Sequence, residues 1–112
     1  MVEVVDKLEQ ELRRGVVVIA ALSQLQTLRY GYELRQSLLE HGLAIEEGTL
    51  YPLLRRLESQ GFLTSEWRTE GGSPRRYYVL SPDGEHLYQR LTERWRDLNE
   101  TMNHLLKLGN PR

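Results

Sequence analysis

Apolar and polar positions follow a helical period between residues 48 and 61, in the segment GTLYPLLRRLESQG. Leucines occupy one face at offsets of zero, three, four and seven: Leu50, Leu53, Leu54 and Leu57. This spacing is typical of an α-helix with one buried face. The opposite side carries small, hydroxyl and basic residues: Gly48, Thr49, Tyr51, Pro52, Arg55, Arg56 and Ser59. We interpret it as a helix that contacts nucleic acid; the alternative is that its arginines belong to a plain solvated face.

Two helices are predicted before this one. Val5, Leu8 and Leu12 have helical spacing, and residues 16–25 (VVVIAALSQL) are nearly all apolar. Periodicity leaves strand and helix open for that apolar run. Its continuity with the preceding leucines favours a helix buried on most sides. A turn over residues 27–32 then leads into a helix over residues 31–40, which ends at Gly42, a natural left-handed residue after a helix C-terminus.

The leucine-faced helix itself should begin near residues 46–48 and end at about residue 60, before Gly61. Pro52 is expected within its first turn or so, where a missing N–H group costs little. Helix, short turn and helix form the helix-turn-helix plan.

A β-hairpin is predicted directly after these helices, over residues 63–80. FLTSEWR alternates apolar and polar positions, EGGSP is a strong turn signal, and RRYYVL is rich in β-formers. Tyr77 and Tyr78 must point in opposite directions; we predict Tyr78 inward with Leu80, and Tyr77 on the surface. A hairpin in this place is a wing. The expected fold class is therefore mainly α with a β-hairpin wing (α+β), a winged helix-turn-helix.

The last predicted element is a long helix that begins with Ser81 as N-cap and Pro82 at the first helical position. One apolar stripe runs along it: Leu87, Leu91, Trp95, Leu98, Met102, Leu105 and Leu108. Such a helix is about 40 Å long, whereas a compact domain of this size has a radius of gyration of only about 13 Å. Part of the stripe should overhang the core and pack on a second copy of the chain.

This pattern divides the chain in two, within one compact unit. Residues 1–80 are expected to form the winged helix-turn-helix DNA-binding domain, and residues 81–112 the C-terminal dimerisation helix. The expected dimer contacts of the last helix are Leu87, Met102 and Leu105.

Charge and composition modify this interpretation only mildly. The net charge is −1, so the chain has no global basic field, although many DNA-binding proteins are basic on one face only. Residues 49–80 hold five basic and three acidic side chains, while residues 1–48 hold five basic and eight acidic. Positive charge is therefore concentrated toward the predicted helix and wing.

Several classes of protein are excluded or disfavoured. The chain has no cysteine, which excludes disulfides, thiolate metal sites and a cysteine nucleophile. His41, His86 and His104 share no spacing, so we expect no metal and no cofactor. No catalytic triad or phosphate loop stands out, and we do not expect an enzyme. No apolar run reaches about 18 residues and the N-terminal segment is charged throughout, so we expect a cytoplasmic protein with no membrane partner.

Five segments together resemble the PadR family of transcriptional regulators: RRG (13–15), YGYEL (30–34), GTLYPLLRRLESQGFL (48–63), PRRYYVL (74–80) and PDGEHL (82–87). The resemblance implies a winged helix-turn-helix homodimer that dimerises through its C-terminal and N-terminal helices. It therefore adds Leu8 and Leu12 of the first helix to the expected dimer contacts. The single C-terminal helix is similar to the smaller subgroup of the family. Arg29 stands before YGYEL, where the family more usually has an apolar residue.

The candidate DNA contacts lie on the leucine-faced helix, on the wing and at the start of the preceding helix: Tyr32, Thr49, Tyr51, Pro52, Arg55, Arg56, Arg75 and Arg76. Arginines neutralise phosphates, and the N-terminal end of a recognition helix reaches base edges. The resemblance implies operator contact at Thr49 and Tyr51. Tyr32 either reaches phosphate or packs on Leu34 and Leu38.

Trp95 lies midway along the overhanging stripe, with Leu91 and Leu98 as neighbours. Near a two-fold axis it either packs the interface or lines a slot for a flat aromatic effector, as the resemblance implies. The expected function is a ligand-responsive homodimeric repressor of double-stranded DNA, with a pseudo-palindromic operator whose half-sites lie about one helical turn apart. The alternative is a winged-helix protein-interaction module without DNA binding.

Overall fold

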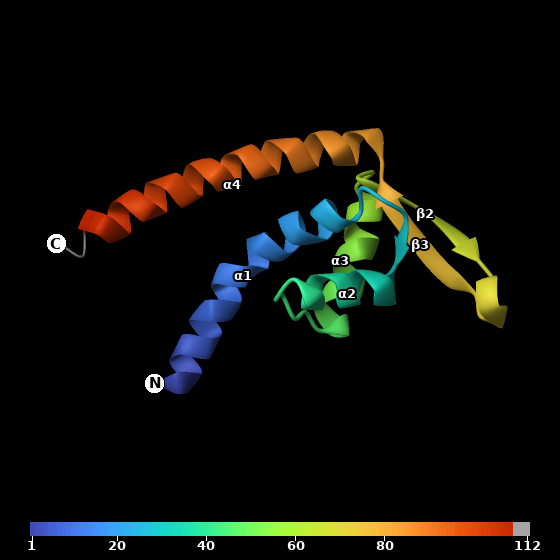
Figure 1. The fold of residues 1–112 in the computed structure, drawn as a ribbon, viewed down its shortest axis with the longest axis horizontal. Helices are drawn as coiled ribbons and strands as arrows, with labels where there is room; N and C mark the ends of the chain where they lie inside the picture. The colour runs from blue at the N-terminus through green and yellow to red at the C-terminus, as the bar shows by residue number, and fades with distance from the viewer. Residues whose placement is uncertain (109–112) are drawn as a thin grey trace.

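The computed structural model describes residues 1–108 and is elongated, with a long helix at each end of the chain (Figure 1). The helices are α1 (Val2–Gln24), α2 (Gly31–Glu40), α3 (Glu47–Ser59) and α4 (Pro82–Leu108). The strands are β1 (Arg29–Tyr30), β2 (Leu63–Arg68) and β3 (Arg75–Leu80), with a 3-10 turn (Glu70–Gly72) between β2 and β3. The predicted α+β class is confirmed. The last four residues of the segment predicted as the dimerisation helix, 109–112, lie outside the described residues.

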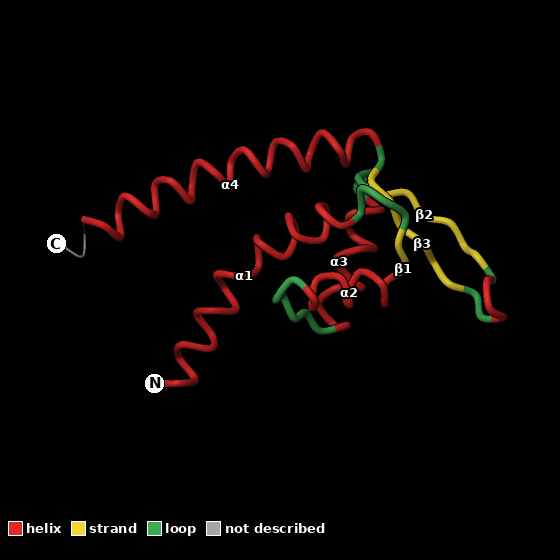
Figure 2. Tube along the Cα trace, viewed as in Figure 1, coloured by secondary structure: helices red, strands yellow, loops and turns green. Residues whose placement is uncertain are grey.

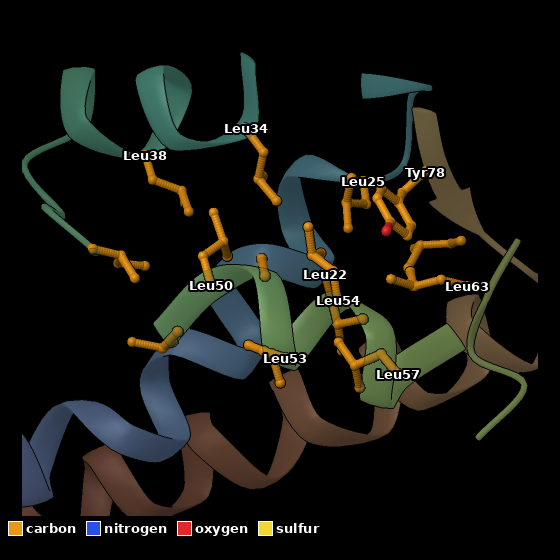
Figure 3. Packing of buried hydrophobic residues seen from close by; sticks show 14 residues of the cluster. Leu22, Leu25, Leu34, Leu38, Leu50, Leu53, Leu54, Leu57, Leu63 and Tyr78 are labelled. Atoms are coloured by element: carbon orange, nitrogen blue, oxygen red, sulfur yellow. The ribbon is translucent and has the colours of Figure 1, made fainter. Parts of the chain in front are cut away.

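The apolar face of α3 is the centre of the core, as the leucine spacing predicted. Its four leucines are all buried, and they face leucines of α1 and α2 (Figure 3). The largest fully buried side chains come from α1, the segment after it, α2 and α3: Leu22, Leu25, Leu34, Leu50 and Leu54. Fully burying one leucine is worth about 1.5–3 kcal/mol, so this face fixes which side of α3 is left for a partner.

Both helix ends predicted at glycines are confirmed. Gly42 and Gly61 have φ of 92° and 86°, the left-handed region that terminates a helix. The placement of Pro52 needs a correction, because it is the sixth residue of α3 and lies in the second turn. It deprives the Gly48 carbonyl of its amide partner. Both residues are exposed, so solvent can satisfy that carbonyl.

Residues 16–24 form a helix, but the prediction that this run is buried on most sides is only partly correct, because Val18, Ile19 and Ala20 are half-buried. Only Val17, Ala21 and Leu22 of α1 are buried, and Val16 is exposed. The reason is that α2 and α4 contact α1, whereas its N-terminal half projects away from the other elements (Figure 1). Leu8 and Leu12 are exposed on that projecting half.

A third strand joins the hairpin, in a sheet of order β1–β3–β2 (Figure 2). The sequence predicted only a turn where β1 lies. In this sheet Tyr30 stands opposite Tyr77, and their rings meet edge to face at 5.3 Å. The prediction that Tyr77 lies on the surface is therefore wrong, since it is buried. Tyr78, which was predicted to point inward, is confirmed in the core.

The junction between β3 and α4 is closed by Ser81. Its hydroxyl accepts the Gly84 amide at 3.0 Å, which confirms the predicted N-cap, and donates to the Gly61 carbonyl at 2.6 Å. The Ser81 amide donates to the Phe62 carbonyl at 3.0 Å. Gly84 is buried against the same peptide, because a Cβ atom there would lie 1.9 Å from the Phe62 oxygen. These hydrogen bonds and this close packing thus attach the start of α4 to the segment that follows α3.

The remainder of α4 leaves the core, as the length of its apolar stripe predicted. Leu87 and Leu91 are half-buried, while the residues beyond them are exposed: Trp95, Leu98, Met102, Leu105 and Leu108. The radius of gyration is 16.6 Å, against about 13 Å for a compact domain of 100 residues. None of the helices in residues 1–108 combines the length and the apolarity needed to cross a membrane.

Candidate nucleic-acid interface

The outer face of α3 is exposed and carries four of the predicted contact residues. Thr49, Pro52, Arg55 and Arg56 are all exposed, and Tyr51 is half-buried. Because the leucines hold the other face in the core, these side chains cannot turn inward without unfolding the helix. The face is suited to a phosphate backbone, to which both hydroxyl and guanidinium groups donate.

Tyr51 packs on the start of α2. A Cβ atom at Gly31 would lie 2.5 Å from Cε1 of the Tyr51 ring, so only glycine lets the ring lie this close. Tyr32, the next residue of α2, is 54% exposed and stacks on Tyr30 with ring centroids 6.3 Å apart. The alternative that Tyr32 packs in the core on Leu34 and Leu38 is therefore wrong.

Arg75 extends this aromatic surface onto the wing. Its guanidinium carbon lies 4.6 Å from the Tyr30 ring centroid, within the range of a cation–π contact. A shallow cavity of about 270 Å³ lies between α2, α3 and β3, lined by Tyr30, Gly31, Tyr32, Tyr51, Arg55, Arg75, Arg76 and Tyr78. The structure thus brings together predicted residues from three elements: Tyr32, Tyr51, Arg55, Arg75 and Arg76. Tyr30 joins them without having been predicted as a contact.

Arg76 has a different environment from Arg75, since consecutive strand residues point to opposite faces of a sheet. Its Nη2 lies 2.8 Å from Glu58 Oε1, and its Nε donates to Ser65 Oγ at 3.0 Å. Burial raises the pKa of the neighbouring Tyr78 hydroxyl, an effect that the Arg76 charge partly opposes. Contact of Arg76 with DNA stays a prediction, and its guanidinium already has protein partners.

Two arginines that the sequence did not place at the site hold the turn between α2 and α3. Arg13 Nη2 of α1 donates to the Ala44 carbonyl at 2.5 Å, and Arg35 Nε of α2 donates to the Ile45 carbonyl at 2.9 Å. Arg35 also pairs with Glu47 at 3.3 Å. Together these bonds set where α3 begins. Arg13 belongs to the RRG segment, but the sequence of that segment does not reveal that its partner is the Ala44 carbonyl.

A second, apolar groove lies between α1 and α4, away from the α3 face. Its volume is about 410 Å³, and both helices line it: Leu12, Gly15, Val16, Val18, Ile19, Leu91, Arg94, Trp95 and Leu98. Trp95 is 41% exposed within it, and Arg94 is the charged residue of the lining. Within residues 1–108 no three histidine or carboxylate side chains gather as a metal site.

Comparison with known proteins identifies relatives over most of the chain. The Transcriptional regulator PadR-like family matches residues 18–90. Transcriptional regulator Rv3488 of Mycobacterium tuberculosis is 43% identical over 77 residues, which are 69% of each chain. A padr family transcriptional regulator from Eggerthella lenta has a similar structure, with a TM-score of 0.87, 45% identity and 94% of each chain covered. A PadR-like transcription factor from Bacteroides fragilis has a TM-score of 0.73 and 37% identity, over 88% of this chain and 98% of its own.

Proposed function

This chain belongs to the PadR-like family of transcriptional regulators, and on that premise we propose that it is a homodimeric repressor of a pseudo-palindromic operator. Members of the family are regulators that bind DNA, not enzymes. In the proposed complex, the α3 helix of each copy enters a major groove and each hairpin flanks it as a wing. Two copies require half-sites about one helical turn apart.

One observation carries the DNA-binding part of the proposal: three separate elements place arginine and tyrosine on one exposed surface. Arg55 comes from α3, Arg75 from β3 and Tyr32 from the start of α2, with Tyr30 at the end of β1 beside them. Guanidinium and phenol groups donate to phosphate oxygens, which supply affinity without sequence information. Thr49 and Tyr51, with Pro52 and Arg56 beside them, are the proposed contacts at the groove. The same surface argues against a protein-interaction module that has lost DNA binding.

The dimer part of the proposal rests on the stripe of α4. From Trp95 onward, its apolar residues are exposed in the described chain, and Leu8 and Leu12 of α1 are exposed as well. We therefore propose residues 1–80 as the DNA-binding unit and 81–112 as the dimerisation segment, with contacts at Leu8, Leu12, Leu87, Met102 and Leu105.

Arg55→Ala and Arg75→Ala should each weaken DNA binding and make it less dependent on salt. Each lost phosphate contact lowers the slope of log K against log salt by about 0.9. The measurement is fluorescence anisotropy over a salt series from roughly 50 to 200 mM, with a duplex that the wild-type protein enriches from random oligonucleotides. Lys107→Ala, an exposed charge at the far end of α4, is the control and should change neither quantity. Wild-type affinity independent of salt would contradict the proposal.

The last part of the proposal is that the regulator responds to a ligand, and the groove beside Trp95 supports it. Arg94 in its lining favours a planar aromatic compound that carries a negative charge. In a Trp67→Phe background, where Trp95 is the remaining tryptophan, 2-naphthoate should quench the emission more strongly than neutral 2-naphthylmethanol. Arg94→Ala should abolish that preference. If both compounds quench the emission equally while Arg94 is present, the ligand does not need a negative charge. If neither compound quenches it, the groove is not a ligand site.

A further inference from the structure

Three polar side chains form a closed network between α3 and the wing. Arg76 of β3 donates to Glu58 Oε1 of α3 at 2.8 Å and to Ser65 Oγ of β2 at 3.0 Å. Ser65 Oγ in turn donates to Glu58 Oε2. Each residue therefore contacts the other two, and the three come from three different elements. We call this set, Glu58, Ser65 and Arg76, the brace.

Two aromatic rings hold the Arg76 guanidinium from its sides. Its central carbon lies 5.7 Å from the ring centroids of both Trp67 and Tyr78. Trp67 is the direct cross-strand partner of Arg76, and Tyr78 is the partner of Ser65. Cation–π contacts on a partly desolvated guanidinium are attractive. The direction of the side chain is thus set by a carboxylate, a hydroxyl and two rings, in addition to its own strand.

The brace lies where the hairpin departs from the helices. Leu63 and Leu80, at the base of the hairpin, are buried in the core. The β2–β3 hairpin extends past the helical body (Figure 2), and Trp67 of β2 is 64% exposed. The side chains of the core thus hold the base of the wing. The ion pair of Glu58 with Arg76 is the polar link from α3 to the portion that extends.

We propose that the brace fixes the angle of the wing relative to α3, so that Thr49 and Tyr51 of α3 meet base edges while Arg75 of the wing meets the backbone of the same half-site. Arg76 is then a positioning residue that acts through Glu58 and Ser65 and does not contact phosphate. Its neighbour Arg75, on the other face of the sheet, is the residue that contacts DNA. This inference rests on the proposed function, because it assigns roles within the same DNA-binding surface.

The test compares Arg76→Gln, Glu58→Gln and the double variant with Arg75→Gln, on two duplexes. One is the duplex enriched by the wild-type protein, and the other is its scrambled counterpart. Arg76→Gln and Glu58→Gln should each weaken binding to the enriched duplex roughly tenfold, with an unchanged salt slope and unchanged affinity for the scrambled duplex. The double variant should be no weaker than either single one, since both remove the same brace. Arg75→Gln should weaken binding to both duplexes and lower the salt slope by about 0.9.

Other results would overturn the brace. If Arg76 contacts phosphate, Arg76→Gln will lower the salt slope as Arg75→Gln does, and Glu58→Gln will tighten binding by removing a nearby negative charge. If Arg76 serves stability alone, its variant will melt at a lower temperature but keep the wild-type ratio of affinities for the two duplexes.

A wild-type protein that enriches no duplex contradicts the proposed function and not the brace. The brace is then tested by the fluorescence emission of Trp67 in a Trp95→Phe background. Glu58→Gln should shift this emission, and an unchanged emission would contradict the brace.

Discussion

Replacing Gly84 with alanine should strongly destabilise the fold. The new Cβ atom would lie 1.9 Å from the Phe62 carbonyl oxygen and 2.9 Å from its carbon, and a backbone group cannot swing aside as a side chain does. The Phe62 oxygen also accepts the Ser81 amide at 3.0 Å, so any shift breaks the junction between α3, β3 and α4. We expect the free energy of unfolding to fall by on the order of 3 kcal/mol.

The measurement is thermal unfolding followed by circular dichroism, at one protein concentration because association with a second copy also shifts the midpoint. A loss of this size should lower the midpoint by roughly 10 °C or more. Gly48→Ala is the matched control, since a Cβ atom added there would meet no other atom within 4 Å and the residue is helical. It should unfold at the wild-type temperature or slightly above. Equal midpoints for the two variants would contradict the close packing at Gly84.

A glutamate at Leu98 should convert the proposed dimer into folded monomers and largely abolish operator binding. Leu98 is 64% exposed on the apolar stripe of α4, so its replacement leaves the core of one chain intact but buries a charge at the proposed interface. Two linked binding sites exceed one by about 10²- to 10⁴-fold in affinity. The enriched duplex should therefore be bound at least about 100-fold more weakly, while circular dichroism stays that of the wild type.

Asn103→Glu separates the effect of the stripe from that of charge. Asn103 is exposed on α4 and lies off the apolar stripe, and its replacement adds the same negative charge. Sedimentation should show a dimer for the wild type and for Asn103→Glu, and a monomer for Leu98→Glu. A wild-type protein that sediments as a monomer, or a Leu98→Glu variant that sediments as a dimer, would refute this assignment of the interface.

The helices were predictable because each has its own local signal. The leucines of α3 recur at one period, Gly42 and Gly61 mark ends, and Ser81 with Pro82 marks a start. Strand β1 has no such signal, since it is two residues long and exists only through pairing with β3. The error at Tyr77 follows from missing that strand, because the Tyr30 ring that covers it lies 47 positions away in sequence. Burial of α1 was overestimated for a related reason, as its apolar run faces a groove and not a closed core.

Within the candidate site, sequence spacing predicted which elements would carry the basic residues, but not which partners those residues have. Arg75 and Arg76 look equivalent in the sequence, yet alternation along β3 sends one to Tyr30 and the other to Glu58. The partner of Arg76 lies on α3, so only the tertiary structure shows that its guanidinium is paired. The hydrogen bonds of Arg13 and Arg35 to backbone carbonyls are equally invisible, because every residue offers such an acceptor.

The order of strands in the sheet has a consequence for synthesis of the chain. The middle strand β3 is the last of the three to leave the ribosome, and the edge strand β1 precedes it by more than 40 residues. Until β3 emerges, neither Tyr30 nor Trp67 has its cross-strand partner. The long loop that joins Tyr30 to Tyr77 must also close before the pairing of β1 with β3 is rewarded. A nascent chain that ends before Arg75 can thus form the three leading helices but not the surface proposed to bind DNA. Assembly of that surface is a late, long-range event, which separates the folding of the helices from the acquisition of binding.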